Sequence, residues 1–239
     1  MYPLRMMRQP LRLALLVTLV VVAMSACGGG GGSAQEQANK PRHLPENNAT
    51  LRPGEYRSDE FKHSLSFRVG KGWEHVAPEL SDKLAISPGG EPGDPLLIFR
   101  NLRQVYKPAK GMAAPPAVEA PKDMVGWLQH HPYLKTDKPQ PVTVGGVKGE
   151  QLEVLIDHLP KNPNVYCDPE PSSCLDIFNL SGDDQIGYFG KNFNKRRVIV
   201  LGDVKGDTVV IWYAGPPDTF DKFAHKAQKV VDSVKWSGS

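Results

Sequence analysis

The chain lacks the short motifs by which many enzymes and nucleotide-binding proteins are identified. It has no G-x-S-x-G elbow, P-loop, HExxH zinc motif, EF-hand loop or S-x-x-K pair. These absences exclude the enzyme classes that are built on one contiguous motif. A hydrolase whose residues converge from distant positions stays an alternative. We expect a non-catalytic protein with no cofactor and no metal site.

The chain also lacks an apolar run long enough for a permanent membrane span. The apolar segment Leu13 to Ala26 has 14 residues, whereas a spanning helix needs roughly 20. Three arginines precede it, Arg5, Arg8 and Arg12. A positive region followed by a short apolar region and small residues is typical of a signal peptide, here residues 1–26.

Cysteine is scarce, and the first of the three cysteines directly follows this signal. Met24-Ser25-Ala26-Cys27 resembles the lipobox of bacterial lipoproteins, with Met24 in place of the usual leucine. The resemblance implies cleavage before Cys27, a diacylglyceryl group on its sulfur, and an extracytoplasmic protein anchored to the bacterial membrane. Two acyl chains give durable anchoring. An ordinary signal with an incidental cysteine is the alternative.

Net charge is absent once the signal is removed. The full chain has 29 Lys and Arg against 26 Asp and Glu, and the three arginines of the signal leave 26 against 26. A protein with no net charge has no global field that recruits polyanions. We therefore expect no nucleic-acid partner, and any charged surface must be local.

Large apolar residues are rare between the lipobox and Tyr56. Residues 27–55 are rich in Gly, Pro, Asn, Gln and charge, so they bury too little surface to offset the entropy of ordering. We expect a flexible tether that leads to one extracytoplasmic domain at 56–236. Removing residues 28–55 is then expected to leave its stability unchanged.

The domain is dominated by strand patterns. Gly145-Gly146 joins two alternating segments, 142–144 and 147–155, as a two-residue hairpin turn does. The other expected strands are 65–69, 84–87, 96–106, 175–180, 185–189, 198–204 and 208–213. Short connections between them predict antiparallel pairing.

Two segments have helical periodicity, 121–131 and 218–234. In the second, Phe220, Phe223, Ala224, Ala227, Val230, Val231 and Val234 form one apolar stripe. His130 and His131 end the first, and their adjacency favours an inward-facing His131 beside Trp127 over a metal site. We predict an α+β fold, a single domain with a mainly antiparallel sheet flanked by two helices.

Three stretches resemble PsbP/Mog1-like domains. They are a first hairpin that ends in Gly-Lys-Gly-Trp at 70–73, the hairpin VTVGGVKGEQLEV at 142–154, and the last strand with the C-terminal helix at 206–236. The resemblance implies an α/β/α sandwich that serves as a binding or accessory module without a shared active site. The segment from Cys167 to Cys174 departs from many members of the family.

Cys167 and Cys174 flank a Pro-rich loop. In an oxidising compartment this even pair predicts a disulfide, which would stabilise the fold by about 2.5 kcal/mol. A redox-active pair or a zinc site is the alternative, although neither has CxxC spacing and only His158 lies near in sequence.

Strand directions bring three loops to the same end of the sheet as Cys167 and Cys174. These loops carry Tyr166, Lys191, Phe193, Lys195, Arg196 and Arg197. Aromatic residues and arginine often anchor interfaces, so this end is a candidate partner-binding surface. A solvated hairpin with Phe193 against the core is the simpler interpretation, because basic turns are common.

These observations favour a monomeric module that docks on an envelope protein or a cell-wall component. A small-molecule-binding lipoprotein, with the loop 107–120 over a cleft, is the main alternative.

The lipobox predicts that Cys27→Ala blocks processing. The variant should accumulate as a precursor and incorporate no palmitate analogue in metabolic labelling. Equal labelling of the variant and the wild type would refute the lipid anchor.

The cysteine pair predicts a bridge in protein taken from the envelope. Mass mapping without reduction should find the Cys167 peptide joined to the Cys174 peptide. Free thiols at both positions would contradict it.

Overall fold

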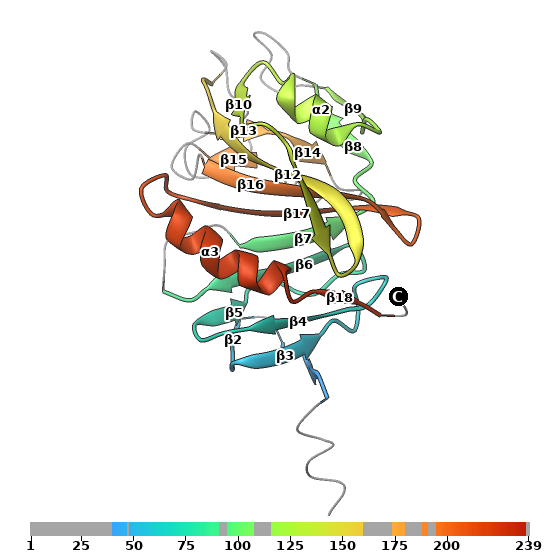
Figure 1. The fold of residues 1–239 in the computed structure, drawn as a ribbon, viewed down its shortest axis with the longest axis vertical. Helices are drawn as coiled ribbons and strands as arrows, with labels where there is room; N and C mark the ends of the chain where they lie inside the picture. Colours follow the sequence, from blue (N-terminus) through green and yellow to red (C-terminus); the bar gives the residue numbers. More distant parts are fainter. Residues whose placement is uncertain are drawn as a thin grey trace, which may run out of the picture. The chain divides into compact units, whose positions relative to one another are not determined.

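The computed structural model describes residues 40–46, 48–90, 95–107, 116–159, 174–179, 188–190 and 195–237 (Figure 1). Contacts divide the chain into Met1–Asn39, which lies outside the described residues, and Lys40–Ser239.

The largest sheet has nine strands in antiparallel pairs. Its order is β10 (Leu134–Thr136), β12 (Val147–Ile156), β16 (Lys195–Val204), β17 (Asp207–Gly215), β7 (Leu96–Arg100), β6 (Lys83–Pro88), β5 (Trp73–His75) and β2 (Ala49–Leu51), and β11 (Gln140–Val144) pairs with β12. The expected antiparallel pairing is confirmed for this sheet.

Three smaller sheets accompany it. The first contains β1 (Arg42–His43), β3 (Gly54–Arg57), β4 (Leu65–Val69) and β18 (Lys235–Trp236), with β1 parallel to β3. The second pairs β13 (Cys174–Asp176) with β15 (Tyr188–Gly190), and the third contains β14 (Phe178–Asn179), β8 (Gln104–Tyr106) and β9 (Ala117–Glu119). The two helices of the described residues are α2 (Met124–Gln129) and α3 (Phe220–Val231).

The hairpin between β11 and β12 forms as its glycines predict. Gly145 and Gly146 have φ angles of 56° and 83°, which a type I′ turn requires and which only glycine adopts without strain. The turn packs against the C-terminal strand, because a Cβ added at Gly145 would lie 2.6 Å from the ring of Trp236. The Trp236 indole donates a hydrogen bond to the Val144 carbonyl at 3.1 Å.

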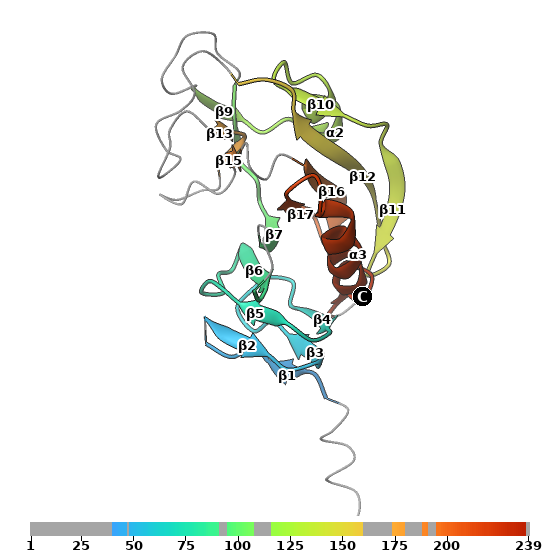
Figure 2. The same cartoon turned by 90° about the vertical axis from the view of Figure 1, so that its left-hand side faces the viewer.

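Helix α3 covers one face of the large sheet. Its predicted apolar stripe is buried throughout, from Phe220 to Val231 and on to Val234, and each of its Phe and Val side chains stabilises the fold by about 1.5–3 kcal/mol. The stripe shares a core cluster with Ile199, Ile211 and Tyr213. Figure 2 shows the sheet curving so that β11 and β12 pass beside α3.

The opposite face of the large sheet has its own core. Val198, Val210 and Trp212 of β16 and β17 pack there with residues of α2 and of the small sheets, among them Leu128 and Phe178. Strand β17 alternates between the two cores, with Ile211 in one and Trp212 in the other. A strand that is buried on both faces needs a continuous apolar run, and β17 has one.

The predicted α+β class is wrong, because the described residues form mainly strands. Eighteen strands accompany the two helices, and α2 is only six residues long. The face opposite α3 is covered largely by short strands that supply Val105, Leu175 and Phe178. An α/β/α sandwich therefore does not form. Pattern reasoning identified the helices but could not show how little surface α2 covers.

One further expectation about the strands needs correction. Residues 96–106 form two strands rather than one, because the chain turns at Asn101, whose φ of 54° lies in the left-handed region that asparagine tolerates. The expected first hairpin is present, because β3 and β4 are consecutive antiparallel strands and β4 ends directly before Gly70. Strand β4 pairs with β3 and β18, whereas β5 pairs with β6 and β2, so Gly70 to Gly72 carry the chain from one sheet to another.

The domain begins earlier than the tether assignment of 27–55 implies. Residues 42–43, 49–51 and 54–57 form β1, β2 and β3, and Leu51 is fully buried. These strands have few apolar side chains, and they join the domain by pairing with other strands. Amino-acid composition does not reveal such pairing. Removal of residues 28–55 would therefore take β1, β2 and part of β3 with it.

His131 lies where the sequence places it. The ring is buried, 5.1 Å from that of Trp127 and 5.9 Å from that of Tyr133, and its Nε2 has no hydrogen-bond partner among the described residues. Trp73, Trp212 and Trp236 are also buried, as expected of core residues.

Burial lowers the pKa of His131 from 6.5 to about 4, which predicts an acid-sensitive fold. Between these values the unfolded chain takes up the proton first, so stability is lost as the pH falls. The free energy of unfolding can be measured with urea at pH 7 and at pH 4.5. Between these two pH values it should fall by about 2–3 kcal/mol less in His131→Gln than in the wild type.

The matched control is His225→Gln, since His225 is exposed on α3. It should lose as much stability as the wild type over the same pH interval. An equal loss for His131→Gln would show that His131 is not the titrating group.

Candidate functional site

The predicted partner-binding surface falls only partly within the described residues. Cys27, Cys167, Tyr166, Lys191 and Phe193 lie outside them, so the lipid anchor, the disulfide and most of the surface stay predictions. Cys174 is the first residue of β13 and lies opposite Gly190 of β15. Lys195 lies opposite Gly215, as the expected strand directions require.

Lys195 and Arg197 are engaged inside the molecule. The Lys195 ammonium donates to Asp221 of α3 at 2.9 Å and lies 3.2 Å from the Glu153 carboxylate of β12. Arg197 donates to the same Glu153 carboxylate at 2.7 Å. The side chain of Arg196 is fully buried.

Arg197 also reaches a buried tyrosine beneath α3. It lies 3.4 Å from the Tyr213 hydroxyl, which donates at 2.9 Å to Gln228 of the helix. Burial raises the pKa of Tyr213 to about 12, so the hydroxyl keeps its proton. These contacts join β12, β16 and β17 to α3 and do not present a free basic surface.

A second charged cluster lies at the turn between β16 and β17. His63 bonds Asp207 at 2.6 Å, and Arg100 donates to the same carboxylate and to the Ser81 carbonyl, the latter at 2.9 Å. Burial acts to raise the pKa of Asp207, but the bonds from His63 and Arg100 outweigh it and leave that pKa lowered. The cluster ties three segments together, and we assign it a structural role.

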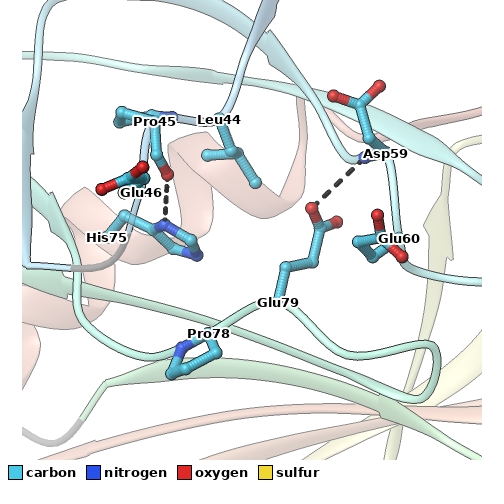
Figure 3. A pocket seen from close by; sticks show the side chains of 8 residues that line it. All are labelled: Leu44, Pro45, Glu46, Asp59, Glu60, His75, Pro78 and Glu79. Atoms are coloured by element: carbon cyan, nitrogen blue, oxygen red, sulfur yellow. Dashed lines mark hydrogen bonds between the residues drawn. The ribbon is translucent and has the colours of Figure 1, made fainter.

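An open pocket of about 380 Å³ lies at the β2 edge of the large sheet (Figure 3). It collects side chains from the segment between β1 and β2, the loop between β3 and β4, strand β5, and the loop between β5 and β6. The lining residues are Leu44, Pro45, Glu46, Asp59, Glu60, His75, Pro78 and Glu79. Four carboxylates and one imidazole therefore share this pocket.

His75 is the buried polar member of the pocket and is only 3% exposed. Its Nδ1 lies 2.8 Å from the Pro45 carbonyl oxygen. Its Nε2 is buried and has no hydrogen-bond partner among the described residues. Figure 3 shows the ring between Pro45 and Pro78, with Nε2 facing the middle of the pocket. An unpartnered buried polar atom is costly and calls for an explanation.

Two of the four carboxylates have partners within the domain. Glu79 accepts hydrogen bonds from the backbone N–H groups of Asp59 and Phe61, both at 3.3 Å. Asp59 contacts His43 and lies 3.3 Å from Arg57. These bonds hold the loop between β3 and β4 in place. We find no ion pair for Glu46 or Glu60 within the described part of the chain.

The pocket is not a preformed metal centre. No group of three or more His, Cys, Asp or Glu side chains in the described ranges is arranged to hold a metal ion. Among the same residues, no helix has the length and apolar character needed to cross a membrane.

Sequence reasoning missed this pocket for two reasons. The tether assignment removed Leu44 to Glu46 from the domain, and the acidic residues are spread over 34 positions from 46 to 79. A signal was present in His75, which follows the buried Trp73 with the strand period of two. That spacing places His75 on the inward face of β5.

Comparisons with known proteins assign no family. No protein-family model and no curated protein match the chain. Among solved structures it is similar to cyanobacterial PsbP (CyanoP) from Synechocystis sp. PCC 6803, with 12% identity over 81% of this chain and 98% of that chain and a TM-score of 0.36. The neighbour is a PsbP protein, the group that the sequence resembles. Similarity at this level supports no argument about the site.

Proposed function

We propose that the chain is a lipid-anchored, extracytoplasmic binding module that docks on a protein partner in the cell envelope through the acidic pocket. The observation that carries the proposal is that acidic side chains line the same open pocket as His75, whose buried Nε2 has no hydrogen-bond partner among the described residues. A binding site leaves such groups unsatisfied until its partner arrives.

The lipobox supports a site of action close to the membrane. Leu44, the first residue that lines the pocket, lies 17 positions after Cys27. A fully extended chain of this length reaches at most about 60 Å. A lipid on Cys27 would therefore keep the pocket within reach of other membrane-attached proteins.

The rim of the pocket supports a protein partner over an enclosed small molecule. The pocket is open, and Leu80, directly after Glu79, is one of two large hydrophobic residues of the described chain that are exposed, at 37%. An acidic recess beside an exposed apolar side chain offers the mixed contacts of a protein interface. The loop that would cover a small ligand, 107–120, lies mostly outside the described residues.

Photocrosslinking in native membranes tests the proposal. A photoreactive amino acid that replaces Leu80 in the full-length lipidated chain should give a discrete adduct with one protein. The same substitution at Val118, which is 36% exposed in β9, is the matched control.

The Leu80 adduct should fall at least fivefold when Glu46→Gln and Glu60→Gln are combined, because the acidic recess then loses charge. It should persist in Glu119→Gln, which neutralises an exposed carboxylate of β9. The proposal fails if Leu80 gives no adduct, or if Val118 captures the same protein equally well.

A further inference from the structure

We propose that the pocket receives the side chain of a lysine or an arginine from the protein partner. This inference rests on the proposed function and specifies its chemistry.

The hydrogen bond of His75 determines what its free nitrogen offers. A carbonyl oxygen only accepts hydrogen bonds, so Nδ1 must donate to Pro45. In the neutral imidazole, the proton on Nδ1 leaves a lone pair on Nε2. In the neutral ring the unpartnered atom that faces the pocket is therefore an acceptor, and it is complemented by an N–H or O–H donor.

The charges of the pocket select a cationic donor. Its ionisable lining consists of Glu46, Asp59, Glu60, Glu79 and His75, with no lysine or arginine among the lining residues. Arg57 balances Asp59 from outside the lining. Ionised carboxylates only accept hydrogen bonds, so an ammonium or guanidinium would form charge-assisted bonds where a neutral donor would form weaker ones.

The remaining walls are apolar and fit the stem of such a side chain. Leu44, Pro45 and Pro78 line the pocket beside the acidic groups. Figure 3 shows Leu44 and Pro78 on opposite sides of the space in front of His75. Lysine and arginine bury a chain of methylene groups and keep a charged end group at the polar side. Inorganic cations lack such a stem, and the described residues offer no preformed metal geometry.

Peptide titration of the full-length chain tests this inference. The probe is the peptide acetyl-Ala-Arg-Ala-amide, and its control is the same peptide with citrulline, which has the shape of arginine without its charge. The arginine peptide should bind at least tenfold more tightly. In nitrogen-15 spectra it should shift Nε2 of His75 and leave Nδ1 nearly unchanged.

Matched variants test whether the arginine peptide binds at the pocket. Glu46→Gln combined with Glu60→Gln should weaken arginine-peptide binding at least fivefold, and Glu119→Gln should not change it. The two pocket carboxylates have no ion pair in the described ranges. Neutralising them should therefore leave the unfolding midpoint unchanged, which a thermal scan checks.

Three results would overturn the inference. They are equal binding of the arginine and citrulline peptides, a shift of His75 with zinc but not with the arginine peptide, and binding of free agmatine without binding of the peptide. The Leu80 crosslink separates this inference from the proposed function. A Leu80 adduct together with no binding of the arginine peptide would leave the docking proposal intact. It would refute the inference that a basic side chain of the partner enters the pocket.

Discussion

Burial of the central strands on both faces is the constraint on which the rest of the domain depends. Strand β17 places Ile211 and Tyr213 in the core beneath α3 and Trp212 in the core on the other face. Both faces must therefore be covered, because exposed apolar surface of this extent would be unfavourable in water. α3 covers one face, and α2 with the short strands covers the other.

Charged residues near these cores are used to hold the covering elements. Lys195 and Arg197 join α3 to β12 and β16 through Asp221 and Glu153. Asp207 does the same for the turn between β16 and β17 by bonding His63 and Arg100. Such partly buried groups keep their charge only when they are paired. Lys195 and Arg197, which look available in the sequence, are thus occupied in the fold.

The acidic pocket does not involve the central strands, because it lies at the β2 edge of the large sheet. Its loops are held by backbone bonds, as where Glu79 accepts from Asp59 and Phe61. In the described part of the chain, Glu46 and Glu60 have no ion pair and the Nε2 atom of His75 has no hydrogen-bond partner. Loops on a rigid scaffold are the usual place for binding residues, and in our proposal this pocket serves that role for a partner's basic side chain.

The sequence by itself determined the elements whose signals are local. Gly145-Gly146 specified a hairpin because both residues adopt positive φ angles, and the stripe from Phe220 to Val231 specified α3 because its period matches the helix. Only the tertiary structure decided the fold class, the start of the domain near Lys40 and the pocket. These depend on pairings between residues far apart in the chain, such as Leu51 with Trp73, and no local pattern encodes which strands will meet.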